Sequence, residues 1–159
     1  MNMQTFLNER GVRFDVLTHD PTYDAQHMAQ AVHVSGHEVA KTVLLRADHA
    51  YSYIVAVLPA TRMVDFAKAC RALGGAELAL ATETEMASLC PDCEIGALPP
   101  FGSQYDLKTV VDETLVEDEY IVFEGNTHAE AIRMRLADFL DLEHPLVLAI
   151  SSPAVVHAV

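Results

Sequence analysis

Two strand-like runs near the centre of the chain constrain its fold more than any other feature. Thr42–Ala47 and Tyr51–Leu58 are rich in β-branched and aliphatic residues and are almost continuously apolar. The segment between them, Asp48-His49-Ala50, predicts a hairpin. Because a strand that is apolar on both faces is usually covered on both faces, we expect these two strands to lie inside a sheet.

Shorter helix and strand patterns surround this hairpin without a regular βαβ rhythm. Helices are predicted around Phe6–Leu7 (ending at Gly11), at Asp24–Val34 with Asp24 as N-cap, at Arg62–Leu73, at Thr82–Leu89 with a capping box, and at Leu136–Leu142. Further strands are predicted at Phe14–Leu17, Thr109–Val111, Tyr120–Phe123 and Ala131–Arg135, and a loop at Cys90–Gly102. The pattern favours an α+β fold, a single domain over residues 1–159 with a mixed, largely antiparallel sheet flanked by helices.

The distribution of charge restricts the partners. The net charge is −13, and all of the excess lies in residues 72–159, which hold sixteen acids and only Lys108, Arg133 and Arg135 as bases. The run Asp112–Glu124 alone has six acids and no base, and we interpret it as a solvated face. This charge argues against DNA, broad nucleic-acid or anionic membrane binding. With no membrane-length apolar stretch and no signal-like N-terminus, we expect a cytoplasmic protein.

Neither a metal site nor a cofactor site is predicted. His33 and His37 are four residues apart, and Cys90 and Cys93 form a single CxxC, but neither pair has a second pair at ligand spacing. The CxxC precedes a proline-rich loop, where a redox dithiol would instead begin a helix. Phosphate-loop, dinucleotide-binding and serine-hydrolase motifs are missing from the sequence as well.

Three local features carry candidate chemistry. Lys41 opens an apolar strand, where its ammonium must reach solvent over apolar surface or point at a ligand. The stiff segment Gly96-Ala97-Leu98-Pro99-Pro100-Phe101-Gly102 is either a structural crossover or a loop that presents backbone N–H groups to a carbonyl or phosphate oxygen. The turn Gly125-Asn126-Thr127-His128 offers either a substrate-orienting histidine or an ordinary surface one.

The order and spacing of these features resemble a known family. A Lys-Thr at the start of an apolar strand, a Gly-x-x-Pro-Pro-x-Gly loop and a Gly-x-x-His turn occur in this order in the editing domain of bacterial prolyl-tRNA synthetases. The resemblance extends to its free-standing relatives, the YbaK/EbsC-type aminoacyl-tRNA deacylases, and covers roughly Asp15 to Leu140. It implies hydrolysis of the ester that joins a wrong amino acid to its tRNA.

The resemblance also implies a role for each candidate residue. Lys41 would be catalytic, because an ammonium can stabilise the oxyanion that develops on an ester or hold the terminal nucleotide. Water would be the nucleophile, with no metal or cofactor. Thr42 would shape the amino-acid pocket, and the glycine–proline loop would hold the 3′-terminal adenosine. The implied substrate-binding residues are Thr42, Gly96, Ala97, Leu98, Pro99, Pro100, Asp112 and His128.

The implied partner is the acceptor end of an aminoacyl-tRNA. An unpaired 3′ end needs few phosphate contacts, so we expect the pocket mouth beside Lys41 and arginines of residues 1–71, with the run Asp112–Glu124 facing away. Because the acidic half is a poor surface for tRNA, an aminoacyl-tRNA synthetase is a further candidate partner. The alternative function is a catalytically idle relative that binds a ligand or partner as a regulator. The net charge favours this alternative, whereas Lys41 and the intact loop favour the enzyme.

Overall fold

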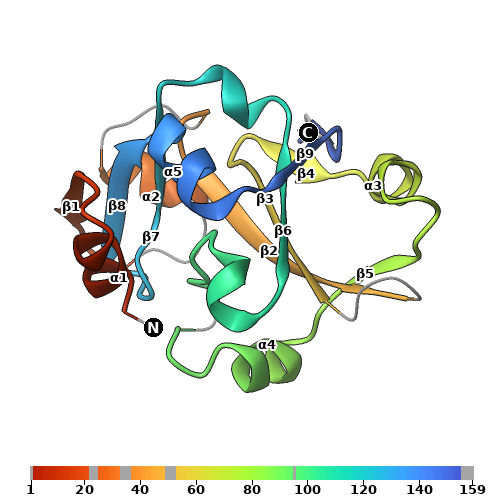
Figure 1. Cartoon of the computed structure of the whole chain (residues 1–159), viewed down its shortest axis with the longest axis horizontal. Helices are drawn as coiled ribbons and strands as arrows, with labels where there is room; N and C mark the ends of the chain where they lie inside the picture. Colours follow the sequence, from red (N-terminus) through yellow and green to blue (C-terminus); the bar gives the residue numbers. More distant parts are fainter. Residues whose placement is uncertain (1, 22–24, 33–36, 49–52, 95, 155–159) are drawn as a thin grey trace, which may run out of the picture.

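The computed structural model describes residues 2–21, 25–32, 37–48, 53–94 and 96–154 (Figure 1). The α-helices are α1 (Met3–Glu9), α2 (Ala25–Ala31), α3 (Phe66–Ala72), α4 (Glu83–Leu89) and α5 (Leu136–Glu143), with 3-10 turns η1 (Gly102–Tyr105) and η2 (Leu115–Glu117). The strands are β1 (Phe14–Thr18), β2 (Ala40–Ala47), β3 (Tyr53–Pro59), β4 (Arg62–Val64), β5 (Leu78–Leu80), β6 (Lys108–Asp112), β7 (Tyr120–Glu124), β8 (Glu130–Arg135), β9 (Leu146–Leu148) and β10 (Ser151–Pro153). No helix in these ranges is long and apolar enough to cross a bilayer.

The described strands form three sheets. The largest has the order β5-β2-β3-β6-β9, a second has the order β1-β8-β7, and β4 pairs with β10. The β3–β6 and β6–β9 pairs are parallel and the other named pairs are antiparallel. These sheets confirm the predicted α+β fold with mixed, largely antiparallel pairing. As their apolar sequences predict, β2 and β3 lie inside the largest sheet.

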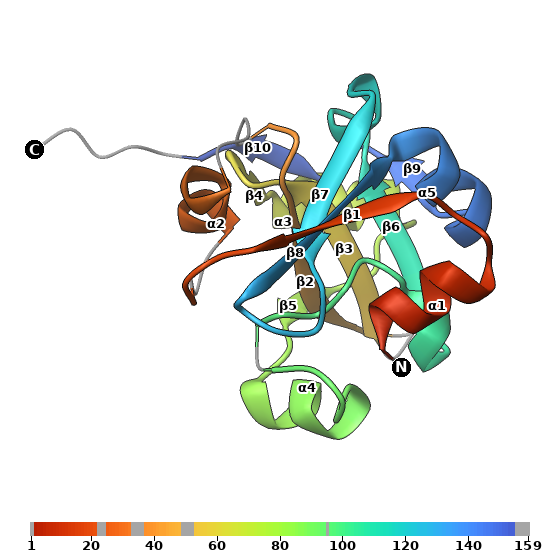
Figure 2. The same cartoon turned by 90° about the vertical axis from the view of Figure 1, so that its left-hand side faces the viewer.

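The main core lies between the largest sheet and the β1-β8-β7 sheet, which cross in Figure 2. Val55 and Val57 of β3 contribute from one side, and Phe123 of β7 and Ile132 of β8 from the other. This alternation is what the strand period requires, because every second side chain points to the same face.

Two helices cover the outer faces of these sheets. Ala69 of α3 packs in a cluster with Leu45 of β2 and Ile54 of β3. Met28 of α2 packs in a third cluster with Val122 of β7. Both faces of the central strands are therefore buried, which explains their continuous apolar sequence.

One predicted helix is wrong in its first turn. Arg62–Val64, expected to begin a helix that ends at Leu73, forms β4 and pairs with β10. Helix α3 starts only after Asp65, whose side chain accepts a hydrogen bond from the Lys68 backbone N–H at 3.0 Å. An aspartate N-cap fixes the start of the helix because it satisfies an otherwise unpaired N–H.

Other predicted elements agree with the structure to within a few residues. The capping box of α4 is present, with Thr82 and Glu85 bonded to each other's backbone N–H groups. Gly11 follows α1 with a φ of 68°. The predicted N-cap Asp24 and hairpin tip His49-Ala50 lie outside the described residues.

Candidate functional site

A buried histidine–carboxylate pair stands at the end of β7. His128 is 5% exposed, and its Nδ1 atom lies 3.3 Å from both carboxylate oxygens of Glu124, the last residue of β7. The backbone N–H of His128 donates to Glu94 Oε2 at 2.9 Å. His128 is therefore held in a fixed orientation, and it is not the ordinary surface histidine of the alternative interpretation.

Gly96 lies directly against the His128 ring. Its φ is +86°, and a Cβ atom built on it would lie 3.3 Å from His128 Cε1 and 3.6 Å from Nε2. Both facts favour glycine, because an L side chain rarely adopts this φ and would crowd the ring. The Nδ1 atom of the imidazole faces Glu124, and the Cε1–Nε2 edge faces Gly96, the exposed end of the glycine loop. The structure thus brings together two predicted site features from distant parts of the chain.

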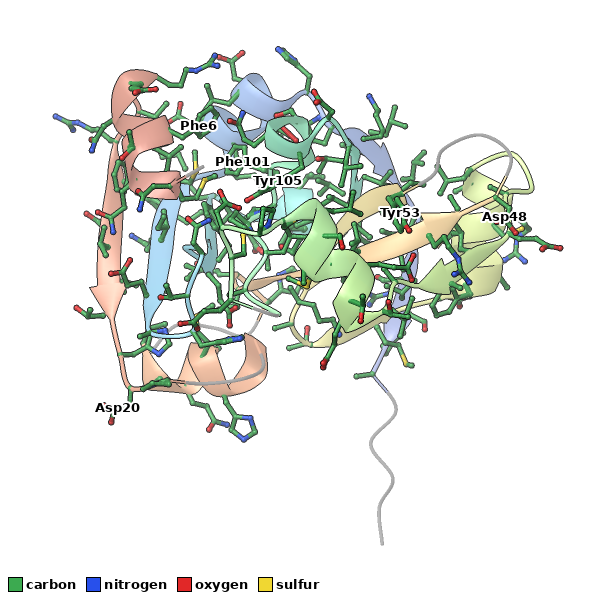
Figure 3. The ribbon with its side chains drawn as sticks, turned by 90° about the horizontal axis from the view of Figure 1, so that it is seen from below. Phe6, Asp20, Asp48, Tyr53, Phe101 and Tyr105 are labelled. Carbon is green, nitrogen blue, oxygen red and sulfur yellow. The ribbon has the colours of Figure 1, made fainter. Side chains whose placement is uncertain are left out.

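The rest of the predicted loop is buried. Ala97, Leu98, Pro99 and Pro100 are all buried, and Phe101 packs edge-on against Phe6, Phe123 and Phe139 at centroid distances of 5.2–5.8 Å. Phe6 and Phe101 lie side by side in Figure 3.

Three backbone donors of this loop are used inside the protein. The Gly96 N–H donates to Met86 Sδ at 3.4 Å. The Ala97 N–H donates to Glu94 O at 2.9 Å, and the Gly102 N–H donates to Thr109 Oγ1 at 2.9 Å. The expectation that the loop offers these N–H groups to a ligand is wrong for Gly96, Ala97 and Gly102. The loop is a buried crossover whose exposed end, Gly96, lies at the histidine.

Lys41 is half-buried near the start of β2, opposite Leu58 of β3. It stands two residues after Val39, so the two side chains leave the strand on the same face. Val39 packs in the α2 cluster together with Ala131, which is the strand partner of Glu124. Val43, two residues further along the same face, packs against the α3 cluster, so alternation places Lys41 between the α2 and α3 clusters, the first of which adjoins the strand pair that carries Glu124. That its ammonium lies within reach of the Gly96–Pro100 backbone remains a prediction.

Thr42 is half-buried and pairs with Val57. Alternation along β2 places it on the face of Ala40 and Leu44, which belong to the main core. Thr42 and Lys41 consequently leave the strand in opposite directions. An amino-acid pocket that contacts both Lys41 and Thr42 would therefore have to extend across β2 from one face of the strand to the other.

Asp112 occupies a structural position at the end of β6. It is 1% exposed and accepts hydrogen bonds from Ile150 N at 2.9 Å, from Thr114 N at 3.2 Å and from the Thr114 hydroxyl. Burial alone would raise the pKa of this carboxyl, but hydrogen bonds from Thr114, the Ile150 backbone and Ser151 outweigh it and lower the pKa. Its oxygens tie β6 to the chain after β9, so the structure does not join Asp112 to His128.

Sequence reasoning missed Glu124 and Glu94. The run Asp112–Glu124 was interpreted as a solvated face, yet its first and last residues are both buried. The available signal was the spacing of Glu124 and His128, four residues apart around a glycine turn. Glu94 carries no comparable signal, because it follows the CxxC as one acid among many in this half of the chain.

The cysteines and other histidines form no second centre in the part of the chain that the structure describes. Burial raises the pKa of Cys90 to about 11, so its thiol stays protonated at neutral pH. Cys93 Sγ lies 3.1 Å from the Tyr105 hydroxyl, and His37 pairs with Asp118 at 2.7 Å. No group of three or more His, Cys, Asp or Glu side chains within the described ranges is placed to hold a metal ion. His33 lies outside those ranges.

Comparison with solved structures defines the class of this fold. A putative trans-editing enzyme for prolyl-tRNA synthetase superposes with a TM-score of 0.82 at 25% identity, covering 94% of each chain. A hypothetical protein superposes with a TM-score of 0.83 at 19% identity, covering 94% of this chain and 98% of the other, and shows the fold alone. The fold is that of the YbaK-type editing domains, as the sequence motifs predict.

The sequence comparisons place the chain more narrowly. The chain belongs to the aminoacyl-tRNA editing domain family, whose profile matches residues 19–142. The Multifunctional Ser/Thr-tRNA deacylase ProXp-y of Escherichia coli is 27% identical over 143 residues, which cover 87% of this chain and 84% of the relative. These matches confirm the predicted enzyme class, an aminoacyl-tRNA editing hydrolase, and its substrate class, aminoacyl-tRNA.

Proposed function

We propose that this protein is a free-standing deacylase that hydrolyses the ester of a mischarged tRNA at its acceptor end. The observation that carries this proposal is the close approach of Gly96 to the buried His128–Glu124 pair. A glycine without a side chain leaves room for the terminal adenosine to approach the histidine ring. The family match and the Lys41 position agree with this arrangement.

Each of three residues has one role in the proposed reaction. With Nδ1–H donating to Glu124, the imidazole of His128 keeps Nε2 as a proton acceptor on the loop side. Water adds to the ester carbonyl, Nε2 accepts its proton, and the Lys41 ammonium stabilises the oxyanion. The bond to the ribose oxygen then breaks, and that oxygen leaves with the proton. Glu124 is the positioning residue, because it acts through His128.

The acidic exposed half suits a protein partner better than a phosphate backbone. Glu113, Glu117 and Glu119 are exposed between β6 and β7. We include in the proposal that this surface docks on a basic face of an aminoacyl-tRNA synthetase, which would bring the substrate to the site. Electrostatic docking of this kind raises association rates and weakens with salt.

A panel of mischarged tRNAs tests the function directly. The purified chain is incubated with each, seryl- and threonyl-tRNA included, and the remaining ester is measured over time. Multiple-turnover release of amino acid from at least one member is expected. Binding of the panel without release would instead favour the regulator, the alternative that the net charge of −13 supports.

A further inference from the structure

A groove on another part of the surface gathers arginines. It encloses about 640 Å³ between α1, the start of β1 and the adjoining ends of β7 and β8. Among the described residues that line it are Arg13, Arg133 and Arg135, with Asp15 as an opposing acid. Two of the three bases in the acidic half of the chain are thus collected in one place, beside an arginine from the neutral half.

One of the three guanidinium groups of the groove lies over an aromatic ring, and the other two are exposed. Arg133 lies over Tyr120, 3.7 Å from the ring centroid. Arg135 is exposed and only loosely paired with Glu119 at 3.9 Å, and both side chains are more than half exposed. An exposed pair of this kind contributes little, so Arg135 can exchange Glu119 for a phosphate at little cost. Arg13 is exposed as well.

The groove and the candidate site share one strand. Tyr120 and Glu124 are the two ends of β7 and point to the same face, about 13 Å apart for four residues of extended chain. Helix α2 packs on Val122 between them, so a nucleic acid that reaches both must run past α2 (Figure 2). With the terminal adenosine in the site, the nucleotides that adjoin it would span a distance of this size and reach the groove.

We propose that this arginine groove binds phosphates of the acceptor strand while the 3′ end occupies the site at His128. This inference rests on the proposed function. Arginine suits the task because its planar donors match phosphate oxygens in pairs and it stays charged at any working pH. The groove also explains how a chain of net charge −13 engages a polyanion: the contact is small and locally basic.

The test compares two charge-reversed double variants with the same change in net charge. Arg13→Glu/Arg135→Glu alters the groove, and Arg46→Glu/Arg71→Glu alters exposed arginines elsewhere. Each is assayed with a full-length mischarged tRNA and with a short 3′-aminoacyl-adenosine ester. The groove variant should raise KM for tRNA about tenfold or more, because it removes charged hydrogen bonds to phosphate. It should leave hydrolysis of the short ester unchanged, and the control variant should resemble the wild type on both.

Two results would overturn the inference. Equal KM values for tRNA in both variants would show that the groove does not bind RNA and serves some other partner. An equal loss on the short ester would show that the arginines act in the site or in the fold. If the wild type hydrolyses neither substrate, the proposed function fails. The affinities of both variants for uncharged tRNA are then compared, and a weaker affinity of the groove variant alone would show that the groove binds RNA.

Discussion

At the scale of single residues, the proposed site rests on one glycine that lies beside one histidine ring. Gly96 combines a left-handed φ with a contact to the ring, whereas Gly75 has a φ of +90° and nothing within 4 Å of its Cβ position. Comparing substitutions at the two glycines therefore separates the effect of backbone strain from the effect of crowding at the histidine. Both substitutions to alanine should lower the free energy of unfolding by about 1–2 kcal/mol.

Only Gly96→Ala should also impair deacylation. Its methyl group would press on His128 Cε1 and shift the imidazole, while Gly75→Ala should keep wild-type kcat. Steady-state kinetics and chemical denaturation of the two variants check this. Equal activity in both would show that the Gly96 contact has no part in the reaction.

Asp112 gives a second prediction at this scale, on stability and pH. Its pKa is lowered in the folded state, so the ionised carboxylate stabilises the fold above its unfolded pKa of about 3.9, and this contribution is lost as pH falls through the folded pKa. Asp112→Asn should therefore cost about 1–3 kcal/mol at pH 7 and progressively less below pH 4 or so. Urea unfolding at both pH values measures the difference. If Asp112→Asn lowered the free energy of unfolding equally at both pH values, the negative charge of Asp112 would not be what stabilises its hydrogen bonds.

At the scale of elements, Phe101 holds the loop that carries Gly96. Its ring lies among three others in the main core, and the loop prolines precede it directly. Phe101→Ala should destabilise the protein by about 3–5 kcal/mol, the usual cost of removing a buried phenyl ring. Phe66→Ala is the matched control, because Phe66 is 39% exposed and should cost far less. Thermal melts report the result, and similar losses in both would contradict the role given to the ring cluster.

The elements also show what sequence can and cannot predict. Long apolar runs and caps identified β2, β3, β7, β8 and α4, because these signals are local. Strands β4 and β10 have three residues each and pair across some ninety positions, so no local pattern marks them. The apolar spacing after Arg62 is typical of a helix, so the predicted helix begins three residues before its N-cap at Asp65.

The candidate site was predictable to a similar degree. Motif order identifies Gly96 and His128 as candidates, and the structure places Gly96 beside the His128 ring. Glu124 could not be singled out within its acidic run. A carboxylate on a strand is expected to be buried only if it has a partner, and the sequence alone does not identify that partner. The basic mouth expected around residues 1–71 is divided in the structure: Arg62 and Lys68 both bond to Ser151, and Arg13 lines the arginine groove. Arg46 and Arg71 are exposed on other elements. Only tertiary pairing determines which of these charges are already engaged.

At the scale of the whole molecule, charge limits how tRNA is bound. The strongly negative chain repels most of a polyanion, so only the acceptor end and a few phosphates should be engaged. The slope of log affinity against log salt concentration should then be shallow, roughly −2 to −3. Filter binding at several salt concentrations gives the slope. A value of about −6 or steeper would indicate a broad RNA interface and contradict this account.

The central claim is that Lys41 acts in the reaction rather than in the fold. Lys41→Ala is compared with Lys108→Ala, since Lys108 is likewise a half-buried lysine on a strand of the same sheet. Single-turnover deacylation of a tRNA that the wild type hydrolyses is measured for both variants, with a thermal melt of each. Lys41→Ala should lose about 10²–10³-fold in rate, the usual effect of removing one oxyanion-stabilising group, with little change in Tm. Lys108→Ala should keep the wild-type rate. Wild-type turnover in Lys41→Ala, or its unfolding, would contradict the claim.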